Sequence, residues 1–106
     1  MKRGEVWWAT LPKPVGRRPV LLLSRNAAYV VRLSVTVAPI TRTIHGIPVE
    51  VPLGPEDGLP KDCVVNLDGI VTIPKKSLDR SVTVLSPGKM ARVAEAIKFA
   101  LDLQEF

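Results

Sequence analysis

Two adjacent arginines and a proline stand in front of an apolar run in the segment "GRRPVLLLSRN", residues 16–26. The ring of Pro19 disfavours helical backbone at Arg18 and favours an extended conformation, which gives the Arg18 side chain a defined exit from a strand. A guanidinium at such a point offers several N–H donors in a planar fork that matches a phosphate. The segment therefore indicates a contact with a phosphodiester.

A threonine at the end of a second predicted strand is the candidate partner of Arg18. If strands at 20–24 and 33–39 pair antiparallel, the start of the first lies beside the end of the second. This register places Thr41 opposite Arg18, to within about two residues, because the connection at 25–32 is too long to fix the register. The Thr41 hydroxyl would then donate to a second phosphate oxygen. The alternative is a solvated arginine pair at a strand end beside an ordinary loop threonine.

Other groups that could do chemistry are scarce. The sequence has no Cys or His spacing suited to zinc, no paired carboxylates in a catalytic context, no glycine-rich phosphate loop and no nucleophile elbow. The single histidine, His45, lies in a loop, and the single cysteine, Cys63, lies among apolar neighbours as a small core residue. We therefore expect no metal and no cofactor. The remaining chemistry belongs to cations, mostly at strand ends: Arg17, Arg18, Arg25, Arg32, Arg42, Arg80, Lys61, Lys75 and Lys76.

Length and composition indicate one small basic domain that spans residues 1–106. The chain is 46% hydrophobic and 24% charged, which is typical of a folded domain with a core. Its formal net charge is +5, the bias expected of a protein that binds an anionic partner such as nucleic acid. One cysteine excludes an internal disulfide, and no apolar stretch is long enough for a signal sequence or a membrane span, so we expect a cytoplasmic protein.

Short apolar runs separated by turn residues predict a mainly β domain, a barrel or a sandwich, that ends in one helix. The predicted strands are 4–11, 19–24, 32–40, 47–53, 63–67, 69–73 and 81–85. The helix starts with Ser86 as N-cap and Pro87 at its first position, and it repeats apolar residues at helical spacing. Further apolar residues, Ala96, Phe99, Ala100 and Leu103, suggest a second face, covered either by more of the barrel or by another subunit.

The motifs occur in an order and at a spacing that resemble the MazF/PemK family of toxin endoribonucleases. They are "RGEVWWATL" (3–11), "RRPVLLLSRN" (17–26), "VAPIT" (37–41), "GLPKDCVVNLDGIVTI" (58–73) and "LSPGKMARVAEAIKFALDL" (85–103), nearly the whole chain. The resemblance implies an SH3-like small β-barrel of the CcdB/PemK type with a C-terminal helix, in a homodimer. It also implies the toxin of a type II toxin-antitoxin system, whose partner is an antitoxin with an acidic, partly disordered segment.

The resemblance further implies metal-independent cleavage of single-stranded RNA at short sequence motifs. The arginine before the proline and the threonine after the third strand carry catalysis in the family, and these match Arg18 and Thr41. Attack of a ribose 2′-hydroxyl on the adjacent phosphorus would leave a 2′,3′-cyclic phosphate and a 5′-hydroxyl. We expect RNA contacts from the polar residues near these strand ends: Arg17, Arg25, Asn26, Arg42 and Lys61.

Two departures from the family pattern bear on specificity and activity. Relatives carry a longer first loop with a Ser-Glu-Gln stretch, whereas only Pro12 to Arg17 separate Leu11 from Arg18 here. Relatives also tend to have arginine and an acid where this chain has Val71 and Pro74. Two alternatives to the nuclease are a toxin that, like CcdB, binds DNA gyrase without hydrolysis, and a catalytically silent member that only binds RNA.

Overall fold

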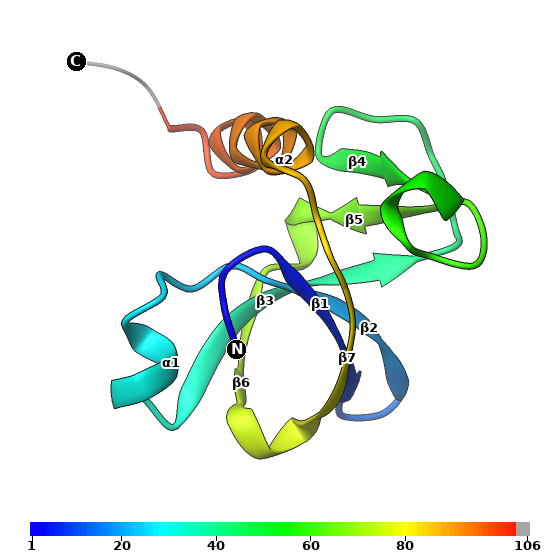
Figure 1. The fold of residues 1–106 in the computed structure, drawn as a ribbon. Helices are drawn as coiled ribbons and strands as arrows, with labels where there is room; N and C mark the ends of the chain where they lie inside the picture. The colour runs from blue at the N-terminus through cyan, green and yellow to red at the C-terminus, as the bar shows by residue number, and fades with distance from the viewer. Residues whose placement is uncertain (104–106) are drawn as a thin grey trace.

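The computed structural model describes residues 1–103, which contain seven strands, one short helix and one long helix (Figure 1). The strands are β1 (Glu5–Thr10), β2 (Arg17–Leu22), β3 (Ser34–Thr41), β4 (Glu50–Leu53), β5 (Cys63–Asn66), β6 (Val71–Pro74) and β7 (Leu78–Val84). The helices are α1 (Ala28–Val31) and α2 (Pro87–Ala100), with single 3-10 turns η1 (Pro55–Asp57), η2 (Leu67–Gly69) and η3 (Lys75–Ser77). The predicted mainly β fold with a C-terminal helix is confirmed.

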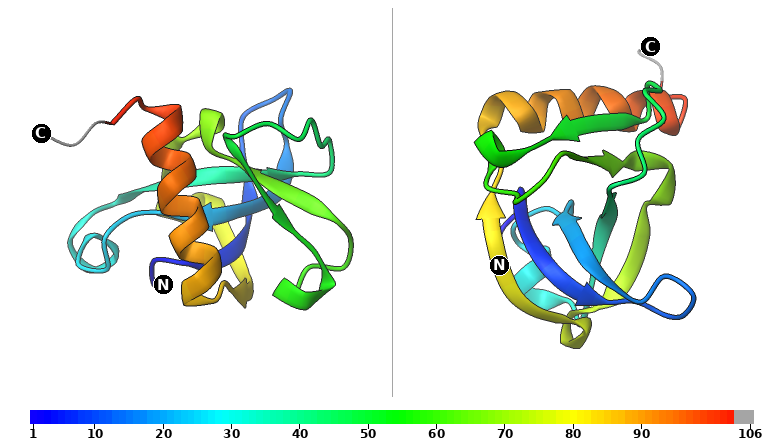
Figure 2. Two further views of the ribbon diagram at one scale, coloured as in Figure 1. Left: turned by 90° about the horizontal axis from the view of Figure 1, so that it is seen from above. Right: turned by 90° about the vertical axis from the view of Figure 1, so that its right-hand side faces the viewer.

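The strands form one strongly curved antiparallel sheet in the order β4-β5-β3-β2-β1-β7, with β6 paired to β3. Strand β3 belongs to both halves of the sheet, because its first residues pair with β6 and its last two pair with β5. The sheet therefore curls into a small barrel at one end and carries the β4–β5 pair and α2 at the other (Figure 2).

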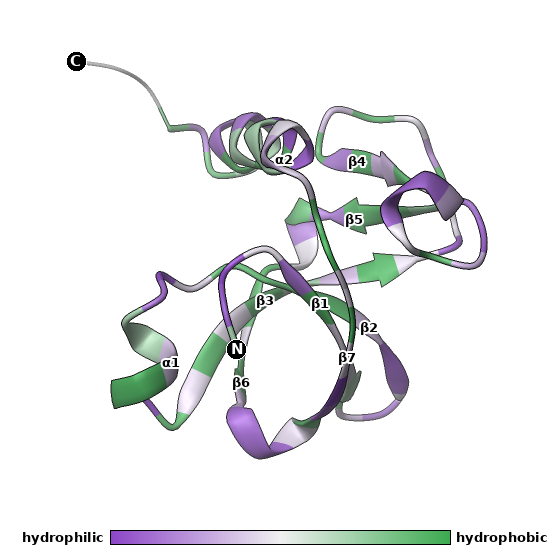
Figure 3. Cartoon of the chain, viewed as in Figure 1, coloured by the Kyte–Doolittle hydropathy of each residue, from purple (hydrophilic) through white to green (hydrophobic). Residues whose placement is uncertain are grey.

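Alternation along the central strands divides the core between the two sides of the sheet. Leu21 and Ala38 belong to the core between the sheet, the β4–β5 pair and α2. Their sequence neighbours Val20 and Val37 belong to the core inside the barrel. Since neighbouring residues of a strand point to opposite faces, one short strand contributes to both cores. Hydrophilic segments concentrate in the loops and turns between the strands and at the start of β2 (Figure 3).

Helix α2 begins where the sequence predicts. The Ser86 hydroxyl accepts a hydrogen bond from the Lys89 backbone N–H, and Pro87 occupies the first turn, where its missing N–H costs no helical bond. The helix packs Val93 and Ala96 into the core below it. Of the residues predicted to form a second apolar face, Ala96 and Ala100 pack inward, whereas Phe99 and Leu103 are exposed.

Element boundaries differ from the predicted ones where packing decides them. The connection at 25–32 contains the short helix α1, whose Ala28 and Tyr29 are buried, so β3 starts at Ser34 instead of at 32. Strand β7 starts at Leu78, three residues before the predicted strand, because it pairs with β1 along most of that strand's length. Neither α1 nor α2 is long and apolar enough to cross a membrane.

Candidate functional site

Strands β2 and β3 pair in the register that the sequence predicts. Val20 pairs with Pro39 and Leu21 with Ala38. Continued by two residues, this register sets Arg18 opposite Thr41, although the ladder itself ends at Val20. Beyond that point β3 pairs with β5 at Thr41, while β2 keeps at Arg18 only the pairing with β1 that it has along its other edge. The two residues therefore lie at neighbouring strand ends, where the β2 and β3 backbones separate.

The Arg18 guanidinium makes a single long contact with the first loop. Its Nη2 donates to the Val15 carbonyl oxygen at 3.3 Å, and within residues 1–103 its buried Nε has no partner. The loop is closed by the Leu11 N–H, which donates to the Gly16 carbonyl oxygen at 3.0 Å. Most donors of Arg18 are thus uncommitted, which is the state that an incoming phosphate requires.

Arg17 occupies the other face of β2 and is already paired. Its Nη2 and Nε donate to the Asp79 carboxylate at 2.9 and 3.2 Å. Its guanidinium also lies over the Trp8 ring, 4.6 Å from the centroid. The register between β1 and β2 agrees with the placement of the two arginines on opposite faces. Arg17 pairs with Thr10, whereas Arg18 pairs with the buried Ala9. The sequence did not indicate this pairing, which joins residues 62 positions apart.

A pocket of about 480 Å³ borders Thr41. Its walls are mainly apolar, and three exposed cations stand at its rim, namely Arg42, Lys61 and Arg80. The other lining residues are Trp8, Pro19, Ile40, Leu59, Pro60, Cys63 and Val82. Arg42 and Lys61 were expected near the site. Trp8 and Arg80 were not, because it is the pairing of β1 with both β2 and β7 that sets Trp8 beside Pro19 and Arg80.

Arg25 and Asn26 lie away from this pocket. They follow β2 at its far end, about 20 Å from Arg18 along an extended strand. Asn26 Oδ1 accepts a hydrogen bond from the Arg3 backbone N–H at 2.7 Å, and Arg25 lines a separate surface beside α1. The structure brings Thr41, Arg42 and Lys61 together and leaves these two residues apart from them.

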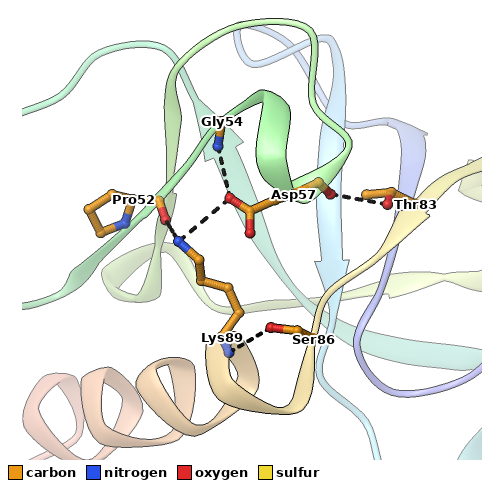
Figure 4. A network of polar contacts seen from close by, with 6 residues as sticks. All are labelled: Pro52, Gly54, Asp57, Thr83, Ser86 and Lys89. Carbon is orange, nitrogen blue, oxygen red and sulfur yellow. Dashed lines mark hydrogen bonds and ion pairs between the residues drawn. The ribbon is translucent and has the colours of Figure 1, made fainter.

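A polar network holds the loop that forms one wall of the pocket (Figure 4). The Asp57 carboxylate accepts from the Gly54 N–H at 3.0 Å and lies 3.5 Å from Lys89 Nζ, which donates to the Pro52 carbonyl oxygen at 2.7 Å. Both charged side chains are largely buried, with Asp57 only 8% exposed. The first turn of α2 is thereby tied to η1, immediately before Leu59.

Gly58 allows this loop to lie close against β7. Its φ is +91°, a left-handed conformation that favours glycine. A Cβ at this position would clash with the Thr83 hydroxyl oxygen, and that hydroxyl donates to the Asp57 carbonyl oxygen at 3.1 Å. Any side chain at Gly58 would push the loop away from β7 and displace the pocket wall.

Cys63 presents a neutral thiol at the pocket wall. Burial raises the pKa of this thiol above its ordinary value, and the negative charge of Asp57 raises it further. The group is therefore protonated at neutral pH and suits a packing role. Among residues 1–103, no group of three or more His, Cys, Asp and Glu side chains is placed to hold a metal ion.

Comparison with known proteins gives consistent matches over the whole fold. Residues 2–101 match the family model described as the PemK-like, MazF-like toxin of type II toxin-antitoxin systems. The chain is 38% identical to the probable endoribonuclease MazF2 of Mycobacterium tuberculosis, over 92% of this chain and 95% of that protein.

Solved structures agree with the sequence matches. The Mycobacterium tuberculosis toxin MazF-mt6 has a TM-score of 0.88 at 38% identity, with 95% of this chain and 99% of that chain covered. A mycobacterial endoribonuclease in complex with its cognate antitoxin has a TM-score of 0.87 at 30% identity, with 100% of this chain and 99% of that chain covered.

Proposed function

Because the chain belongs to the PemK-like, MazF-like family, it is a toxin endoribonuclease of a type II toxin-antitoxin system, and we propose that Arg18 and Thr41 perform the cleavage. The substrate is single-stranded RNA, cut at a short sequence motif without a metal ion. The observation that carries this proposal is the β2–β3 register, which sets the two residues at adjacent strand ends. The uncommitted donors of Arg18 support the same role.

The reaction is an intramolecular transesterification. The 2′-oxygen of one ribose forms a bond to the adjacent phosphorus, and the bond from phosphorus to the 5′-oxygen of the next nucleotide breaks. The 2′-hydroxyl proton passes to water, and the departing 5′-oxygen takes a proton from water, which leaves a 2′,3′-cyclic phosphate and a 5′-hydroxyl. The need for a 2′-hydroxyl makes the reaction specific for RNA.

Arg18 and Thr41 act on the charge that develops on the phosphorane. The Arg18 guanidinium exchanges its long contact with the Val15 carbonyl oxygen for the nonbridging oxygens of the phosphate. The Thr41 hydroxyl donates to a second nonbridging oxygen. A guanidinium with a pKa above about 12 is a poor general base, so the role of Arg18 is electrostatic.

The test is cleavage of a long RNA of mixed sequence in the presence of EDTA. We expect cuts at one recurring motif, with 5′-hydroxyl ends that accept phosphate from a kinase and 3′ ends that carry a cyclic phosphate. A requirement for added magnesium or manganese in the bond-breaking step would contradict the mechanism. Intact RNA after incubation with the folded protein would favour the catalytically silent alternative.

We also propose two partners, a second copy of the chain and an acidic antitoxin segment. Exposed apolar side chains at the end of α2 and just beyond it, Phe99, Leu101 and Leu103, support a subunit contact. The basic rim around Thr41 supports binding of an acidic, partly disordered chain that replaces RNA. The mycobacterial relative in complex with its cognate antitoxin is consistent with such a partner.

Both partners are testable in solution. Light scattering should give the mass of a dimer at micromolar concentration, and Phe99→Glu should give a monomer. An acidic antitoxin peptide should compete with RNA. A stable wild-type monomer would contradict the first proposal, and a bound peptide that leaves RNA cleavage unchanged would contradict the second.

A further inference from the structure

We propose that the pocket beside Thr41 is a nucleobase subsite, in which one base of the RNA stacks on the indole of Trp8 while Asp79 holds Arg17 against the same ring. The inference rests on the proposed function, because it takes RNA as the ligand, and it adds a base-stacking residue, Trp8, and a positioning residue, Asp79. Neither belongs to the set expected to contact RNA from the sequence.

The pocket has the size and composition of a base-binding site. Its volume of about 480 Å³ lies within the range of small-molecule pockets. Apolar side chains such as Ile40, Leu59 and Val82 line it, and exposed cations stand at its rim. A nucleobase of an RNA chain fits this combination. The apolar walls remove water from the flat ring, and the cations at the rim contact the phosphates of the RNA backbone.

The backbone of Trp8 is held between two neighbouring strands. It pairs with Pro19 on β2 and with Arg80 on β7, and both partners also line the pocket. The guanidinium of Arg17 lies over the ring, 4.6 Å from the centroid. Among residues 1–103, Trp8 lines the pocket and Arg17 does not, so the pocket side of the indole is available to a base.

Asp79 determines where the Arg17 guanidinium lies. The Asp79 carboxylate accepts hydrogen bonds from Arg17 Nη2 at 2.9 and 3.1 Å and from Nε at 3.2 Å. These bonds fix the plane of the guanidinium over the indole. A guanidinium stacked on one face of an aromatic ring restricts the motion of that ring and leaves the opposite face for a base. Asp79 also neutralises Arg17, so this cation is a support for Trp8 more than a phosphate contact.

Two alternatives for Asp79 predict opposite results. If Asp79 positions Arg17 on the indole, Asp79→Asn loosens the ring and weakens the binding of the base in the pocket. If Asp79 instead competes with an RNA phosphate for Arg17, Asp79→Asn strengthens RNA binding and steepens its salt dependence. The sign of the affinity change therefore decides between a positioning residue and an electrostatic block.

The experiment measures binding without cleavage. The probe is a short single-stranded RNA selected for binding to the protein, with 2′-deoxy substitution that prevents transesterification and with one abasic nucleotide moved through each position. In the wild-type protein we expect one position at which the abasic nucleotide weakens binding by about 5-fold to 150-fold, the effect of one lost base–aromatic stack. Trp8→Leu should bind the unmodified probe more weakly by a similar factor. In this variant an abasic nucleotide at the sensitive position should cause no further loss of affinity.

Controls separate a stacking role from a folding role. Trp7→Leu changes the other tryptophan, which packs against the barrel core, and it should keep the abasic effect. Trp8→Phe should retain most of the affinity, and Asp79→Asn carries the test if thermal melts show that Trp8→Leu is unfolded. Asp79→Asn should weaken binding of the unmodified probe and reduce the effect of the abasic nucleotide at the same position.

Three outcomes overturn the subsite: abasic effects that are equal in the wild-type protein and Trp8→Leu, no abasic effect at any position, or tighter binding by Asp79→Asn. A failure of the proposed nuclease is distinguishable. In that case the wild-type protein leaves unmodified RNA intact, yet the Trp8-dependent abasic effect persists in the binding measurement.

Discussion

Arg17 and Arg18 are adjacent in the chain but lie on opposite faces of β2. Arg17 is bonded to Asp79 and stacked on Trp8, whereas Arg18 keeps most of its donors uncommitted. Pairing with β1 sets this difference, because Arg18 pairs with the buried Ala9 and Arg17 with the exposed end of that strand. Two residues of the same type therefore have different surroundings at one strand end.

Arg18→Ala is expected to lower cleavage by about 100-fold or more, the effect of removing one preorganised donor to the transition state. The free energy of unfolding should change by less than about 0.5 kcal/mol, because the guanidinium makes only one long contact. The measurement is single-turnover cleavage with RNA at saturation, beside a thermal melt.

Arg17→Ala is the matched control for that variant. It should weaken RNA binding and leave the cleavage rate at saturation near the wild-type value. If Arg18→Ala cleaves normally and Arg17→Ala is inactive, the roles assigned to the two faces of β2 are reversed.

Thr41→Val keeps the shape of the side chain and removes only the hydroxyl. We expect a loss of cleavage of about 10-fold to 100-fold, less than for Arg18 because a neutral donor stabilises the phosphorane less than a cation does. The same single-turnover assay measures it. Thr43→Val, two residues further along, is the control, and an equal loss in both variants would argue for a general effect on the 42–49 loop.

Asp57→Ala is expected to destabilise the fold by about 1–2 kcal/mol, because it removes the carboxylate that accepts from the Gly54 N–H and pairs with the partly exposed Lys89 ammonium. Chemical denaturation measures this change. The KM for RNA should also rise in the folded variant, since η1 precedes the pocket wall formed by Leu59, Pro60 and Lys61. Lys98→Ala, in the exposed pair with Glu95, is the control and should change stability by less than about 0.5 kcal/mol.

Cys63 should make stability fall at alkaline pH. Burial raises the pKa of the folded thiol, so above about pH 8.5 the unfolded chain loses this proton while the folded chain retains it. The contribution of the protonated thiol to the free energy of unfolding is fully present below the pKa that Cys63 has in the unfolded chain. It is lost as the pH rises toward the higher pKa that Cys63 has in the folded chain. Urea unfolding in reducing buffer at pH 7.5 and 9.5 should show a smaller loss for Cys63→Ala than for the wild-type protein. Burial also raises the pKa of Tyr29, but that effect is common to both proteins.

The elements of this fold were predictable because their signals are local. Alternating β-branched residues predict the strands, and Ser86 with Pro87 predicts the start of α2, since caps and alternation act within a few residues. The β2–β3 register was predictable to within about two residues, because an antiparallel return places the start of one strand beside the end of the other, although the long connection does not fix the exact pairs. Arg18 and Thr41 were therefore placed together from the sequence.

Only the tertiary structure decided what surrounds those two residues. The contact between Arg17 and Asp79 depends on the pairing of both their strands with β1, and it joins residues that the sequence separates by most of the chain. The pairing of β1 with β2 and β7 sets Trp8 beside Pro19 and Arg80 at the pocket, and the change of partner of β3 from β6 to β5 sets Thr41 at its edge. Residue types set the local conformations, but closure of the sheet sets which side chains meet, because it depends on contacts between strands distant in sequence.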